Sequence, residues 1–249
     1  MVDHGVRIAE IARMPREELR RAAMSAPQSE SVDGAGSLPG MLDSALEAVA
    51  GLDAQALERI LFRATGMGTL PAREMCERVL LPLLREIGKR WEERRLSIAA
   101  EHFGSAIVRA RLLALLASEA RHRLNAHKVV CACPEGELHE GGLLAFAVHA
   151  AGSGLELLYL GANTPIEEVL AAAEATGART VALSLTRPMG KPQLGKLLSR
   201  LSAWKTGGGE RRVLLGGSAA EREQERFRRA GLFVLAQATG MGLNWGDSE

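Results

Sequence analysis

The chain has 249 residues, of which 47% are hydrophobic and 24% are charged, a balance that is typical of a folded globular protein. Its formal net charge of +1 argues against binding of nucleic acid through the overall charge of the chain. The longest apolar stretch, 143–152, is too short to span a bilayer, and no apolar signal segment opens the chain. The three cysteines do not make a disulfide framework, so we expect reduced thiols and a cytoplasmic location without membrane contact.

Residues 1–40 are expected to form an N-terminal extension and a flexible linker. Segment 6–24 has weak helical periodicity, whereas segment 25–40 is rich in Ser, Gly and Pro and almost free of large apolar residues. The first forty residues carry five arginines against six acidic residues, a net charge of about −1. A DNA-binding arm is normally basic, so direct DNA binding by this segment is not expected.

Residues 41–124 are predicted to form a four-helix bundle. Apolar residues recur there at spacings of three and four, as in Met75, Val79, Leu83, Ile87 and Trp91. Pro82 interrupts the third segment and is expected to kink or offset it, because proline has no backbone N–H. Ser97 is the expected N-cap of a fourth helix that runs to about Arg121. Short connections between the four helices favour an antiparallel bundle.

Residues 125–249 are predicted to form a Rossmann-like (flavodoxin-like) domain around a parallel sheet, because short strand-like runs alternate with amphipathic helical runs. The expected strands are 129–133, 155–160, 180–185, 213–215 and 232–236, and the expected helices are 141–152, 165–176, 191–203 and 219–229. Cys131 and Cys133 are expected on opposite faces of the first strand, as packing residues rather than a metal pair. Open α/β sheets bind ligands at the carboxyl ends of their strands, so the site is expected there.

The loop after the first expected strand, CPEGELHEGG (133–142), contains the strongest candidates for a metal or ligand site. A neutral imidazole such as that of His139 is a good ligand for a transition metal. The carboxylate of Glu137 can accept the other ring N–H and fix the tautomer. Gly142 leaves room for a large ligand at the start of the following helix. Taken alone, a histidine at such a loop position is more often a solvated loop residue than a metal ligand.

The ends of the next strands carry matching signals. Gly161 and Thr164 follow the second strand, Ser184 the third, and Gly216 and Gly217 the fourth. The series resembles the cobalamin-binding domain shared by methionine synthase, corrinoid methyl carriers and B12-dependent mutases. The resemblance implies that His139 coordinates cobalt, the one metal ligand expected, and that the nucleotide tail passes Ser184, Gly216 and Gly217. Two positions depart from that pattern, since Glu137 replaces Asp and Thr186 stands where Leu is frequent.

Trp91 is followed, after nine residues, by Glu101 and His102. This spacing is similar to that of B12 photoreceptors of the CarH and LitR type, and the resemblance covers residues 41–236. It implies that the bundle lies over the upper face of the corrin, with Trp91 capping the upper axial ligand and Glu101 and His102 lining the same pocket. Without the resemblance, Trp91 would be a core aromatic and Glu101–His102 a polar helix start.

Two features depart from the photoreceptor pattern. The residues before the bundle are too few for the MerR-type DNA-binding domain of that family, and the layout resembles antirepressors of the AerR and PpaA type, which act on a transcription factor. Glu92 stands where the photoreceptors place the histidine that replaces the upper ligand after photolysis.

The sequence therefore predicts a cobalamin-binding sensor, responsive to light through adenosylcobalamin, that regulates transcription through a protein partner. Methylcobalamin and hydroxocobalamin remain alternative ligands, and the chain is expected to form a homodimer or tetramer. A corrinoid methyl carrier and a haem or tetrapyrrole sensor are the alternative functions. An enzyme is not expected, because the sequence offers no catalytic triad or paired carboxylates in a convincing setting.

Overall fold

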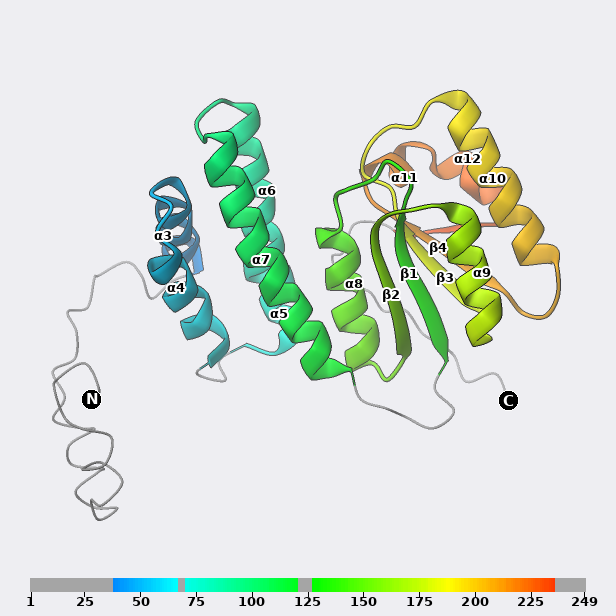
Figure 1. The fold of residues 1–249 in the computed structure, drawn as a ribbon, viewed down its shortest axis with the longest axis horizontal. Coiled ribbons are helices and arrows are strands. Elements are labelled where there is room, and N and C mark those ends of the chain that lie inside the picture. Colours follow the sequence, from blue (N-terminus) through cyan, green and yellow to red (C-terminus); the bar gives the residue numbers. More distant parts are fainter. Residues whose placement is uncertain (1–37, 67–69, 121–126, 236–249) are drawn as a thin grey trace, which may run out of the picture. The chain divides into compact units, whose positions relative to one another are not determined.

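The computed structural model describes residues 38–66, 70–120 and 127–235 (Figure 1). Segment 6–24 and most of the expected linker lie outside the described residues, as does Ala236. The first described helix, α3 (Leu38–Ala50), begins within the expected linker. The last three residues of that linker, 38–40, are therefore helical.

The helical part contains the four expected segments. They are α3, then α4 (Ala54–Gly66), a continuous run of α5 (Ala72–Met75), η2 (Cys76–Leu80) and α6 (Leu81–Glu92), and finally α7 (Ile98–Glu119). A Cβ on Gly104 of α7 would come within 2.9 Å of Val49 and of Ile87, so α7 packs closely against both α3 and α6. The buried side chains follow the predicted spacing and include Leu46, Leu57, Leu61, Met75, Val79, Leu83, Val108 and Leu112. Among the described residues, no helix is long and apolar enough to cross a membrane.

The offset expected at Pro82 takes the form of a π turn. In η2 the Leu81 N–H donates to the carbonyl oxygen of Cys76, five residues earlier, instead of to the residue four earlier. Pro82 follows at the start of α6 and cannot donate a backbone N–H. A single widened turn lets the helix continue without that bond and without a clash from the proline ring.

The expected N-cap of the last helix is confirmed. The Ser97 hydroxyl oxygen accepts the backbone N–H of Ala100 at 3.1 Å, and α7 begins at Ile98.

The C-terminal part is a five-stranded parallel sheet, which confirms the predicted fold class. Its order is β2-β1-β3-β4-β5, the flavodoxin-like arrangement. The strands are β1 (Lys128–Pro134), β2 (Glu156–Thr164), β3 (Thr180–Ser184), β4 (Arg212–Gly216) and β5 (Phe233–Val234). The helices are α8 (Gly141–Gly152), α9 (Ile166–Thr176), α10 (Lys191–Thr206), α11 (Ser218–Arg222) and α12 (Gln224–Arg229). The single helix expected over 219–229 is therefore two short ones.

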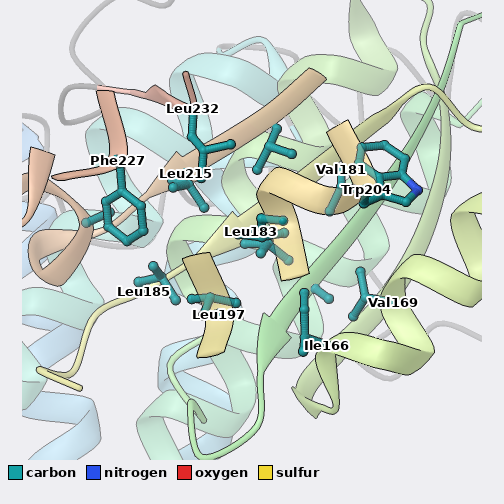
Figure 2. Packing of buried hydrophobic residues seen from close by; sticks show 14 of the residues in the cluster. Ile166, Val169, Val181, Leu183, Leu185, Leu197, Trp204, Leu215, Phe227 and Leu232 are labelled. Atoms are coloured by element: carbon teal, nitrogen blue, oxygen red, sulfur yellow. The ribbon is translucent and has the colours of Figure 1, made fainter. Parts of the chain in front are cut away.

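The two faces of the sheet carry separate cores. On one face, helices α9, α10 and α12 pack Val169, Leu201, Trp204 and Phe227 onto the strands (Figure 2). On the other face, α8 packs Phe146 and Leu143 against Val129, Cys131 and Cys133. The expectation that the two cysteines point to opposite faces is wrong, because residues two apart on a strand share a face.

Candidate functional site

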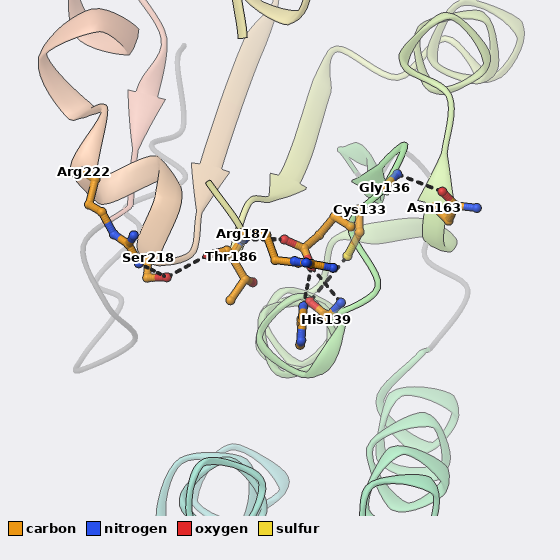
Figure 3. Close-up of polar contacts among 9 residues, drawn as sticks. Cys133, Gly136, His139, Asn163, Thr186, Arg187, Ser218 and Arg222 are labelled. Atoms are coloured by element: carbon orange, nitrogen blue, oxygen red, sulfur yellow. Dashed lines mark hydrogen bonds and ion pairs between the residues drawn. The ribbon is translucent and has the colours of Figure 1, made fainter. Parts of the chain in front are cut away.

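His139 lies in the turn between β1 and α8 and is held by Glu137. One carboxylate oxygen of Glu137 accepts the backbone N–H of His139 at 2.9 Å and lies 2.7 Å from the ring Nδ1. The other oxygen accepts the backbone N–H groups of Thr186 at 2.6 Å and of Arg187 at 2.8 Å (Figure 3). Glu137 therefore joins the turn after β1 to the turn after β3.

These hydrogen bonds favour the charged form of Glu137. Glu137 is only 3% exposed, and burial opposes its charged form. The donors from His139, Arg187 and Thr186 outweigh that effect, so the pKa of Glu137 is lowered. An ionised carboxylate only accepts hydrogen bonds, so Nδ1 of His139 donates to Glu137 and Nε2 is the nitrogen left to bind a metal. The His139 side chain is 60% exposed, which leaves it accessible to a ligand.

A cavity of about 490 Å³ opens beside His139, within the range of small-molecule sites. It lies between the carboxyl ends of β3 and β4, helix α8 and helix α6, and its lining includes the predicted residues His139, Gly142, Ser184, Gly216 and Gly217. A Cβ on Gly142 or Gly216 would meet no atom within 4 Å, so both glycines border open space. Gly217 has φ +96° and a Cβ there would clash with the Leu185 carbonyl oxygen, so the turn after β4 requires glycine.

One face of α6 closes the cavity. Its lining residues are Leu81, Leu84, Arg85, Gly88, Lys89 and Glu92, which recur at helical spacing. Arg85, Lys89 and Glu92 make no ion pair with a residue of the described ranges, so their charges are free to meet a ligand. Helices α6 and α8 approach closely here, since a Cβ on Gly141 would lie 2.7 Å from Leu84 Cδ1.

Comparison with known proteins identifies the two parts of the chain. Residues 41–116 and residues 127–241 each match a family model described as a B12 binding domain. The HTH-type transcriptional repressor CarH of Myxococcus xanthus is 32% identical over 238 residues, which cover 94% of this chain and 77% of that protein. The chain belongs to the B12-binding domain family.

A second curated protein and a solved structure also resemble the chain, the first in sequence and the second in fold. The HTH-type transcriptional repressor CarA of Myxococcus xanthus is 37% identical over 127 residues, which cover 49% of this chain and 41% of CarA. The monomethylamine corrinoid protein of Methanosarcina barkeri has the same fold, with a TM-score of 0.60 at 15% identity, over 81% of this chain and 94% of that one.

The described residues fit the cofactor of the B12-binding family. A histidine with an accessible Nε2 lone pair suits cobalt, which binds imidazole nitrogen. The adjoining cavity has largely apolar walls and open space at two glycines. Both the nitrogen donor and a cavity with largely apolar walls are present at the same strand ends.

The three site residues predicted on the helical part lie outside the lining of this cavity. Trp91 is 45% exposed on α6. At about 100° per residue it lies roughly 20° around the helix from Leu84 and about two turns further along, so it extends the cavity-facing side. Glu101 and His102 contact each other in the first turn of α7, where the His102 side chain is 76% exposed.

Two further predicted residues, Gly161 and Thr164, lie on β2. Gly161 pairs with Ala132 where the register of β1 and β2 shifts, and Thr164 pairs with Pro134 at the end of both strands. The described lining of the cavity does not include them.

Sequence reasoning missed a buried polar group next to His139. Glu140 is 8% exposed, forms an ion pair with Arg109 of α7 and accepts the Tyr159 hydroxyl at 2.6 Å. Burial and the hydrogen bond to Glu140 raise the pKa of Tyr159, so its phenol remains a donor. The available signals were the second glutamate of the motif and the only tyrosine in the chain. Glu140 stands directly before α8 and Tyr159 lies within β2, so no local spacing connects them.

Proposed function

We propose that this chain is a cobalamin-binding sensory protein, without catalytic activity of its own, that regulates transcription through a protein partner. The observation that carries the proposal is His139, which lines a cavity closed by α6 while its Nδ1 contacts Glu137. Similarity to CarH and CarA, both transcriptional repressors, supports the regulatory role.

The residues that line the cavity have different roles in binding the ligand. His139 would bind the cobalt, and Glu137 would hold its ring in place. Ser184, Gly216 and Gly217 border the space for the nucleotide tail. Bound adenosylcobalamin supplies a cobalt–carbon bond that light breaks.

The face of α6 is the element through which we propose that the signal passes. Arg85, Lys89 and Glu92 line the cavity on this helix, and Trp91 extends the same side. A change of the ligand bound in the cavity would change what these side chains contact, and α6 would repack in response. A ligand shifts the equilibrium between two packings of α6 only by as much as its affinities for the two packings differ. A partner protein or a second copy of the chain then binds the altered surface.

The test is an absorption spectrum and a gel-filtration profile of the full chain with adenosylcobalamin, in the dark and after green light. We expect a one-to-one dark complex whose spectrum and size both change on illumination. His139→Ala should weaken binding and shift the spectrum toward a base-on or water-ligated form. His127→Ala, an exposed histidine just before β1, is the matched control. Unchanged affinity and spectrum in His139→Ala would remove His139 from the ligand role.

The same experiment separates the alternatives. The fold is also that of a monomethylamine corrinoid protein, so a methyl carrier is the second candidate. A tight cobalamin complex whose size never responds to light, and which accepts and donates methyl groups, would favour the carrier. Failure to bind any cobalamin, with an iron Soret band on adding haem, would favour a haem sensor.

A further inference from the structure

A second cavity, of about 280 Å³, lies on the other side of Glu137 from the cobalamin cavity. His139 and Thr186 line the cobalamin cavity, whereas Glu137 and Arg187 line the second one. Its walls come from the turns after β1 and β3 and from the first turns of α9 and α10.

The position of this cavity follows from the strand order. The chain leaves β1 toward α8 on one face of the sheet and leaves β3 toward α10 on the other face. Because β1 and β3 are neighbours, the crevice outside their carboxyl ends is the topological switch point. Open α/β sheets bind ligands at such a crevice, so this cavity is a candidate in its own right.

Three of the charged groups that line the cavity, Lys196, Glu167 and Glu137, are already occupied. Lys196 pairs with Glu167 at 3.2 Å. Glu137 accepts hydrogen bonds from its neighbours through both of its oxygens. The side chains of Arg187 and Glu135 have no hydrogen bond or ion pair within the described ranges. One guanidinium and one carboxylate are therefore free to bind opposite charges.

The floor between them is apolar. Ile166 is 7% exposed and Leu197 is 4% exposed, and half-buried Met189 lies beside them. The volume of about 280 Å³ is just below the usual range of ligand sites, which run from about 300 to 1,000 Å³. The ligand must be small, carry both charges and have an apolar body.

We propose that this cavity binds a small zwitterion with an apolar side chain, such as an aliphatic amino acid. Its carboxylate pairs with Arg187, since a guanidinium matches a carboxylate in a two-bond geometry. Its ammonium group pairs with Glu135, and its side chain covers Ile166 and Leu197. Because the Arg187 backbone N–H also binds Glu137, the ligand acts on the group that orients His139.

The test is isothermal titration of the cobalamin-free full chain with L-leucine. Isocaproate, which lacks the ammonium group, and isoamylamine, which lacks the carboxylate, are the matched probes. Leucine should bind once and saturably, and each probe should bind at least about tenfold more weakly, as loss of a charged hydrogen bond requires. Arg187→Gln and Glu135→Gln should each cause a similar loss. Arg179→Gln, an exposed arginine before β3, should cause none.

Three results would overturn the proposal: no saturable binding of leucine, equal binding of either probe, or full binding by Arg187→Gln. Leucine binding must also persist in the chain saturated with cobalamin, because its loss would make the cavity part of the corrin site. This last arm rests on the proposed function. If no cobalamin binds, titration of the cobalamin-free chain still decides the proposal by itself.

Discussion

Arg109 of α7 and Glu140 at the start of α8 form an ion pair that joins the helical part to the residue directly after His139. The Glu140 side chain is 10% exposed and the Arg109 side chain is 53% exposed. Glu140 also accepts the Tyr159 hydroxyl, so α7, the His139 turn and β2 meet at one carboxylate. If α7 moves relative to the sheet, either the ion pair between Arg109 and Glu140 breaks or Glu140 moves together with α7.

We expect Arg109→Ala to lower the free energy of unfolding by about 1–3 kcal/mol, because it leaves a buried carboxylate without its cation. The measurement is a urea titration with the sheet and helical signals followed separately. Arg78→Ala is the control, since Arg78 pairs with Glu74 on an exposed helix surface and such pairs contribute less than about 1 kcal/mol. Equal effects of the two substitutions would show that Arg109 is an ordinary surface residue.

Much of the fold follows from local pattern. The strands and helices lie close to their predicted positions because apolar periodicity reports which face is buried, and Ser97 was recognisable because capping is a local interaction. The break at Glu223 was not recognisable, since helical periodicity runs through 219–229 without a proline or glycine.

Only part of the site could be predicted from the sequence, because spacing along the chain reports local contacts and not distant ones. Glu137 and His139 are two residues apart, so their hydrogen bond could be anticipated from spacing. The pair of Arg109 and Glu140 spans 31 residues and joins two parts of the fold, and no periodicity encodes such a pairing. The same limit applies to the second cavity, whose two free charges come from different strand ends.

His149 should make stability depend on pH. It lies on α8 with a side chain 10% exposed, and its Nε2 is 3.7 Å from Glu77. Burial, only partly opposed by Glu77, lowers the pKa of His149 below the ordinary 6.5. The unfolded chain then binds the proton more readily, so the free energy of unfolding should fall as pH drops below 6.5.

The check is the urea midpoint at about pH 7.5 and about pH 5.5, which bracket the titration of an ordinary histidine. His149→Leu should reduce the difference between the two midpoints. His127→Leu, at an exposed position, should leave it as in the natural chain. An unchanged difference in His149→Leu would mean that the imidazole does not titrate with folding.

Two adjacent glycines should respond to alanine in opposite ways. At Gly216 the added methyl meets no atom within 4 Å, so stability should change by less than about 0.5 kcal/mol. The methyl does enter the cavity, so cobalamin affinity should fall. At Gly217 the positive φ and the clash with Leu185 should cost at least about 1–3 kcal/mol. Urea titration and cobalamin titration of both variants give the comparison, and a stable Gly216→Ala variant with undiminished affinity would place the ligand elsewhere.

Glu137→Gln should damage both folding and ligand binding while keeping side-chain size. The amide nitrogen is a donor, and one of its orientations places it against the N–H groups of Thr186 and Arg187, the other against those of His139. Some donors lose their acceptor in either case, at a cost of about 1–3 kcal/mol. The ring of His139 also loses its charged partner, and changes of this kind lower metal affinity about 10- to 100-fold. Glu156→Gln, on an exposed strand residue, is the control, and cobalamin affinity that stays equal in both variants would show that Glu137 does not orient His139.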